Sequence, residues 1–172
     1  MNIAKYVLFL HVYSAVGLFI GMGLEYQKLI VVKCRAIDES TKWASKREAV
    51  FTMVSMLSAL FTGIYLMITQ WGPAPWMTIA LISLGVLIIV GLSYAKVAKS
   101  ATKMQLINGN EPSGKISEVA LNYAMASIKL RIAIASGIIA LMTVKPPDFS
   151  QAVLLEVLFV ITGYIWVLQK RF

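Results

Sequence analysis

Five segments of the chain are mostly apolar, and each is long enough to cross a lipid bilayer as an α-helix. A helix needs roughly 20 predominantly apolar residues to span the hydrocarbon core. Short polar connections separate the segments, and the connection at 71–75 contains two prolines, which end helices. The pattern predicts an all-α, polytopic membrane helix bundle that forms a single integral membrane domain over residues 1–172. The transmembrane helices are expected at residues 6–32, 50–70, 76–95, 124–144 and 152–168.

The positively charged residues are concentrated in two of the connections and at the C-terminal end. The chain has 16 Lys and Arg residues against 8 Asp and Glu residues, which gives a net charge of +8. Because lysine and arginine are enriched on the cytoplasmic side of membrane proteins, we expect the N-terminus outside and the C-terminus in the cytoplasm. An odd number of spans requires the two termini to lie on opposite sides of the membrane, and the charges agree with this. The residues on the expected cytoplasmic side are Lys33, Arg35, Lys42, Lys46 and Arg47, then Lys96, Lys99, Lys103 and Lys115, and finally Lys170 and Arg171.

The composition excludes several classes of protein. Hydrophobic residues make up 59% of the chain and charged residues 14%, whereas soluble domains carry about a quarter charged residues. This excludes a soluble enzyme and a disordered region, and the single cysteine, Cys34, rules out an internal disulfide or a thiolate-rich metal site. The positive charge favours anionic lipids on the cytoplasmic side of the bilayer. It does not indicate nucleic-acid binding, because neither a basic docking helix nor strand-borne aromatic residues accompany it.

Sequence motifs of soluble enzymes are absent. The chain has no phosphate-binding glycine loop, no His-Glu-x-x-His, no paired-cysteine motif and no serine elbow. The N-terminal apolar segment is not expected to be a signal peptide, because it is too long and no small-residue cleavage site follows it. We therefore expect no catalytic residues. Candidate chemistry is confined to polar residues within the spans, which are costly at membrane depth and so are functional hypotheses.

Five ionisable residues lie at membrane depth in this interpretation. His11 and Glu25 fall on one face of the first predicted helix. With a rise of about 1.5 Å per residue, His11 and Glu156 lie at similar depths below the outer boundary, and Glu25 enters from the inner side at a depth close to that of Lys129 and Arg131. We therefore expect two contacts between helices. One joins His11 to Glu156, and the other joins Glu25 to either Arg131 or Lys129.

Each of these residues also has a simpler interpretation. The side chains of Glu25, Lys129 and Arg131 are long enough to extend to the inner interface. A buried His11 would be a structural residue if its Nδ1–H donates a hydrogen bond to a backbone carbonyl. Glu156 near the start of its helix would be stabilised by the helix dipole without any partner.

Pairs of small residues spaced four apart occur in three of the predicted spans. Such pairs allow membrane helices to approach closely. They indicate a compact bundle, or a dimer interface if one pair lies on the outside. The pairs are Gly17 and Gly21, Ala59 and Gly63, and Ala133 and Gly137.

The segment Leu10–Gly23, which reads Leu-His-Val-Tyr-Ser-Ala-Val-Gly-Leu-Phe-Ile-Gly-Met-Gly, resembles the first helix of a bacterial superfamily. Its members include copper-resistance protein D-like domains, membrane-bound protoporphyrinogen oxidases and uncharacterised predicted integral membrane proteins. This chain also resembles the uncharacterised group at two further places, Pro-Trp at 75–76 and Leu-Met-Thr-Val-Lys-Pro at 141–146. The resemblance implies that His11 corresponds to a first-helix histidine associated with haem in the oxidases. The tryptophan and the Pro-Arg-Leu segment that follow it there are replaced here by Leu-Glu-Tyr-Gln-Lys at 24–28.

Three functions are compatible with these features. The first is an accessory or interaction component of the bacterial cytoplasmic (inner) membrane, with a second copy or another membrane protein as its partner. The second is a haem- or metal-binding protein that uses His11, in which the other haem ligand would be a methionine, an open position or His11 of a neighbouring subunit. The third is a small transporter or proton-linked protein that uses the His, Glu and Arg residues within the spans.

Overall fold

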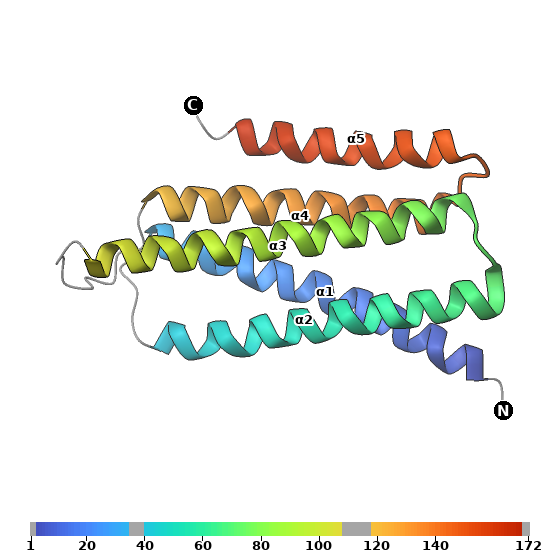
Figure 1. The fold of residues 1–172 in the computed structure, drawn as a ribbon, viewed down its shortest axis with the longest axis horizontal. Helices are drawn as coiled ribbons and strands as arrows, with labels where there is room; N and C mark the ends of the chain where they lie inside the picture. The colour runs from blue at the N-terminus through green and yellow to red at the C-terminus, as the bar shows by residue number, and fades with distance from the viewer. Residues whose placement is uncertain (1–2, 35–39, 108–117, 170–172) are drawn as a thin grey trace.

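The computed structural model describes residues 3–34, 40–107 and 118–169, which form long helices joined by short turns (Figure 1). No strand occurs in these residues, and five helices are long and apolar enough to cross a membrane. The all-α prediction is therefore confirmed, and so is the number of apolar helices. The helices are α1 (Ile3–Cys34), α2 (Ser40–Leu66), α3 (Pro75–Ile107), α4 (Glu118–Val144) and α5 (Phe149–Leu168).

Several helices extend beyond the spans predicted from the sequence. The largest difference is in α3, whose apolar part is Pro75–Ser93 but whose helical backbone continues to Ile107. Hydropathy marks the part of a helix that fits the hydrocarbon core, whereas the backbone hydrogen bonds of a helix continue wherever its residues favour them. The lysines at 96, 99 and 103 therefore lie on the part of α3 that continues beyond its apolar segment.

Two short turns close one end of the bundle. After α2, one turn of π-helix, η1 (Met67–Trp71), leads to Gly72, whose φ of 69° lies in the left-handed region that favours glycine. The helix α3 then starts at Pro75, a first position at which proline is well tolerated. The second turn follows α4, where Lys145 has a φ of 49° and two prolines prevent the helix from continuing.

The helices pack as two groups that meet between α1 and α4. The helix α1 packs along α2, while α4 packs along both α3 and α5, and α1 contacts α4. Figure 1 shows α1 crossing behind α2 and α3, with α5 on the far side of α4 from α2. The turns at 72–74 and 145–148 lie at the same end of the bundle as the start of α1, which we name the short-turn end (Figure 1). The other end is named the opposite end.

A hydrophobic core fills the junction between the two groups. Met22 of α1 and Ala124 and Ile128 of α4 are almost completely buried there. A second apolar cluster joins α3, α4 and α5 nearer the short-turn end, and its buried members are Ile79, Ala80, Leu141 and Ala152.

Candidate functional site

The α1–α2 interface is formed by small residues that face polar side chains. A Cβ added at Gly17 would lie 2.7 Å from the hydroxyl oxygen of Ser55, and a Cβ added at Gly21 would overlap the Thr52 side chain. Real Cβ atoms do not make contacts this short, so both glycines are needed for the observed helix separation. Gly17 and Gly21, the pair that the sequence suggests for close helix packing, therefore both lie in the α1–α2 interface.

His11 lies within this interface near the short-turn end, and it is 9% exposed. Its Nδ1 is 3.1 Å from the backbone oxygen of Ala59 and 2.9 Å from the hydroxyl oxygen of Thr62. A carbonyl oxygen can only accept, so Nδ1 carries the proton and donates it. The ring lies over Gly63, where an added Cβ would be 3.2 Å from Cε1. His11 therefore makes the structural hydrogen bond expected as its alternative role, and Ala59 and Gly63 provide the space for its ring.

Other polar groups of the α1–α2 interface are also paired. The hydroxyl groups of Ser14 and Ser58 are hydrogen-bonded at 2.8 Å. Toward the opposite end, Lys28 forms an ion pair with Glu48. The two helices are thus joined by polar contacts along most of their shared length.

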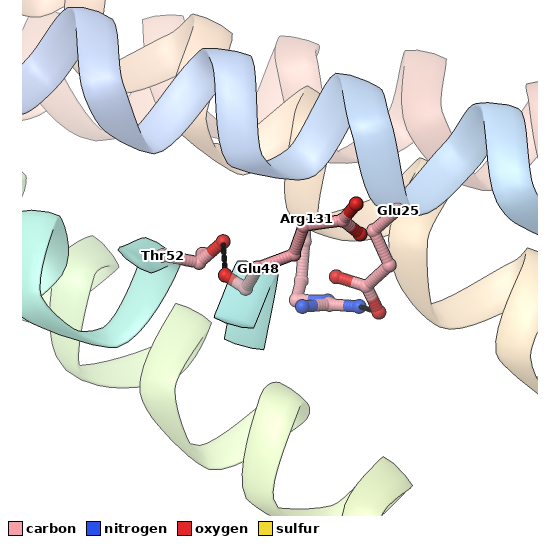
Figure 2. A network of polar contacts seen from close by, with 4 residues as sticks. All are labelled: Glu25, Glu48, Thr52 and Arg131. Carbon is pink, nitrogen blue, oxygen red and sulfur yellow. Dashed lines mark hydrogen bonds and ion pairs between the residues drawn. The ribbon is translucent and has the colours of Figure 1, made fainter. Parts of the chain in front are cut away.

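Arg131 of α4 reaches across to α1 at the opposite end of the bundle. Its Nη2 is 2.5 Å from Glu25 Oε1, and the two side chains are 9% and 30% exposed. Figure 2 shows the guanidinium next to the Glu25 carboxylate, with Glu48 and Thr52 of α2 nearby. The predicted contact between Glu25 and Arg131 is confirmed.

Lys129 connects α4 to α5. Its Nζ donates a hydrogen bond of 3.0 Å to the backbone oxygen of Trp166 and lies 5.3 Å from the centre of the Trp166 ring. The Tyr26 ring packs against the same indole, with ring centres 5.9 Å apart. Lys129 and Arg131 are 3% and 7% exposed, so both are packed inside the bundle rather than extended to its surface.

Glu156 of α5 is buried against α4, and it is 7% exposed. Its carboxyl group lies over Gly137, where an added Cβ would be 2.8 Å from Cδ. Neither carboxyl oxygen makes a hydrogen bond among the described residues, and the Ser83 hydroxyl of α3 is its polar neighbour. The predicted contact between Glu156 and His11 is wrong. Similar depth did not bring them into contact, because His11 lies between α1 and α2, whereas the Glu156 carboxyl group packs against Gly137 of α4.

The other predicted packing positions also lie between helices. Ala133 of α4 is in close contact with Gly163 of α5, where a Cβ could not be accommodated. Gly137 makes room for the Glu156 carboxyl group. Small residues of α4 therefore allow α5 to approach closely, as the spacing of Ala133 and Gly137 predicts.

The described residues contain no group of three or more His, Cys, Asp or Glu side chains that could hold a metal ion. The side chain of Cys34 lies outside the described part of the structure. Three polar residues that shape these sites were not singled out from the sequence, namely Ser58, Thr62 and Ser83. The sequence pattern that could have indicated the polar face of α2 is the helical spacing of Thr52, Ser55, Ala59 and Thr62, which places small and polar side chains on one side of the helix.

Comparison with protein-family models, with curated proteins and with solved structures gives no match for this chain.

Proposed function

We propose that this chain is a proton-linked membrane protein in which Glu156 binds and releases the transferred proton. The observation that carries the proposal is the buried carboxyl group of Glu156, which has no hydrogen-bond partner among the described residues. An isolated carboxylate is costly to bury in apolar surroundings, so such a group either carries a proton or binds a cation. Ionisable groups of this kind within membrane spans commonly belong to proton relays and ion pathways.

The position of Glu156 is suited to proton exchange. It comes seven residues after Phe149, the first residue of α5, which places it about 10 Å along the helix from the short-turn end. Gly137 leaves a space on α4 that the carboxyl group fills. Proton uptake moves one proton from water to a carboxylate oxygen, and release returns it. The group is neutral when the proton is bound, so it can remain packed against the α4 backbone in that form.

The charge distribution suggests how the protein is oriented. The basic residues at 33–47, 96–115 and 170–171 belong to connections or ends on one side of the five spans. By the enrichment of Lys and Arg on the cytoplasmic side, the N-terminus and the short-turn end face outward and the C-terminus faces the cytoplasm. In a bacterial inner membrane, Glu156 would then exchange its proton more readily with the outer side.

Proton flux into liposomes tests this function. The purified protein is reconstituted into vesicles that contain a pH-sensitive dye, and a potassium diffusion potential drives proton movement. We expect wild-type vesicles to change internal pH faster than empty vesicles, and Glu156→Gln to abolish the difference. The matched control is Asp148→Asn, which removes an exposed carboxylate just before α5 and should leave the flux unchanged. Wild-type flux equal to that of empty vesicles would overturn the proposal and favour the accessory function.

A second candidate function rests on the orientation of His11. Histidines that bind metals commonly donate their other ring N–H to a backbone carbonyl, which fixes the ring and exposes the second nitrogen's lone pair. The bond from Nδ1 to the Ala59 carbonyl fits this arrangement, and Nε2 has no partner among the described residues. His11 is the single histidine of the chain, so it would supply one axial ligand of a haem.

An absorption spectrum distinguishes this second candidate. Protein purified from cells supplied with haem should show a Soret band if His11 is a ligand, and His11→Ala should lose it. The control is Thr62→Val, which removes a hydroxyl group next to Nδ1 but retains the Ala59 carbonyl. A featureless spectrum of the wild-type protein would exclude the haem function.

A further inference from the structure

The guanidinium group of Arg131 is buried but makes few hydrogen bonds. The residue is 7% exposed, and its planar head carries several N–H donors that can bind two acceptors side by side. Among the described residues, Glu25 alone accepts a hydrogen bond from it, through Nη2. Its Nε is buried without any hydrogen-bond partner in this part of the chain.

This arrangement differs from the usual structural pair of arginine and carboxylate. Such pairs frequently form two parallel hydrogen bonds, whereas Glu25 contributes one oxygen atom to one nitrogen of Arg131. A buried donor without an acceptor is unfavourable in apolar surroundings. The site therefore has donors that the described chain does not satisfy.

Two neighbours of Arg131, one on α3 and one on α1, bear on how an acceptor could reach it. On the α3 side, Gly91 presents no side chain, and an added Cβ would be 3.9 Å from Arg131 Cδ. On the α1 side, the Glu25 side chain is 30% exposed and so lies between the guanidinium and the surface of the bundle. The partly exposed Glu25 side chain is therefore the group that an incoming acceptor would have to replace.

We propose that Arg131 is a binding site for an oxyanion, either a carboxylate or a phosphate group, and that Glu25 occupies part of this site when no ligand is bound. An incoming oxyanion replaces the Glu25 oxygen on Nη2 and also accepts a hydrogen bond from Nε. Lys28 follows Glu25 by about one turn of α1, and its ammonium group already pairs with Glu48. The oxyanion belongs either to a small solute or to the headgroup of an anionic lipid. This site does not depend on proton exchange at Glu156.

Nuclear magnetic resonance of the arginine side chains tests the proposal. The full chain has four arginines, so the Nε resonances of a protein labelled with ¹⁵N-arginine can be assigned by single substitutions, with Arg131→Lys identifying the resonance of interest. The protein is studied in phosphatidylcholine nanodiscs to which acetate or inorganic phosphate is added. A third sample uses nanodiscs that contain phosphatidylglycerol. Sodium chloride at matched ionic strength is the control for a general effect of charge.

We expect a saturable shift of the Arg131 resonance, with Glu25→Gln increasing the affinity by about tenfold or more because the internal competitor has lost its charge. A shift with acetate or phosphate identifies a solute, and a shift with phosphatidylglycerol alone identifies a lipid headgroup. Arg47→Lys, at an exposed position, should leave the response unchanged. No saturable shift in any sample, in the wild type or in Glu25→Gln, would overturn the proposal. A chloride response equal to that of acetate and phosphate would overturn it as well.

Discussion

Small residues allow close helix packing in both the α1–α2 and the α4–α5 interface, but the two interfaces differ in whether their buried polar groups are hydrogen-bonded. In the first, His11 is bonded to the Ala59 carbonyl and to Thr62, and Ser14 is bonded to Ser58. In the second, the Glu156 carboxyl group lies against Gly137 without a hydrogen-bond partner among the described residues.

This difference separates a structural use of polar groups from a functional one. Hydrogen bonds between membrane helices stabilise the bundle by modest amounts, about 0.6 kcal/mol on average. A buried polar group without a partner is instead destabilising, by roughly 1–3 kcal/mol. A folded chain that retains such a group commonly uses it for binding or chemistry. On this reasoning α1–α2 is the framework of the molecule, and α4–α5 contains the site that we propose to exchange a proton.

The largest expected effect on stability comes from Gly21→Ala in the framework. The added methyl group would overlap the Thr52 hydroxyl group and lie 3.1 Å from Thr52 Cβ. Overpacking of this kind costs about 1–3 kcal/mol, and we expect the upper part of that range because the contact includes atoms close to the α2 backbone. The free energy of unfolding is measured by titration with sodium dodecyl sulfate in mixed micelles.

Gly23→Ala is the matched control for this substitution, because an added Cβ at Gly23 meets no atom within 4 Å. It should leave stability unchanged or raise it by up to about 1 kcal/mol, the difference in helix propensity between Ala and Gly. Equal effects of the two substitutions would show that α1 and α2 do not pack as described.

The second prediction concerns Glu156→Met, which replaces the unpartnered carboxyl group by an apolar side chain of similar length. We expect the free energy of unfolding to increase by about 1 kcal/mol, because an unsatisfied buried group is removed. Proton flux should be lost in the same variant. A loss of stability would instead show that the carboxyl group makes a favourable interaction, and would contradict the contrast between the two interfaces.

The third prediction is a smaller loss of stability for Gly137→Ala. The methyl group would meet the Glu156 carboxyl group, which is the end of a flexible side chain and can move aside. We expect a cost below about 1 kcal/mol, together with a clear reduction of proton flux because the carboxyl group is displaced. Gly85→Ala is the control, since its added Cβ has no neighbour within 4 Å. Unchanged flux in Gly137→Ala would argue against the importance of this packing for Glu156.

The smallest expected effect is the coupling between Ser14 and Ser58. A double-mutant cycle with Ser14→Ala and Ser58→Ala should give a coupling energy of about 0.6 kcal/mol, typical of hydrogen bonds between membrane helices. The hydrogen bond of 2.8 Å between the hydroxyl groups is the physical basis. A coupling energy indistinguishable from zero would show that this hydrogen bond does not stabilise the α1–α2 interface.

The sequence was sufficient to predict the apolar helices, the packing glycines and one of the two polar contacts. Depth predicted a contact of Glu25 with either Arg131 or Lys129, because opposite charges at one level of a small bundle attract each other strongly in apolar surroundings, and Arg131 makes that contact. Depth failed for His11 and Glu156, since it gives a position along a helix axis but not which helices are neighbours. That information depends on how the helices pack, and here α5 packs on α3 and α4.

The polar side of the α1–α2 interface was harder to predict from the sequence. Thr52, Ser55 and Thr62 are ordinary residues for a membrane helix, where a hydroxyl group often bonds to the preceding turn, as Thr52 does to the Glu48 carbonyl. Their role depends on the residues that face them on α1. The unpartnered state of Glu156 is likewise a property of its surroundings, and no pattern in the sequence indicates it.

Infrared spectroscopy of Glu156 is the most direct test of the central claim, which is that this carboxyl group exchanges a proton. The carbonyl stretch of its protonated form is assigned by difference from Glu156→Gln in lipid films. The account predicts that this band is present at about pH 5 and disappears reversibly as the pH is raised to about 10, a range that covers titrations known for buried carboxyl groups. A band of constant intensity over the whole range, or its absence at every pH, would contradict the claim.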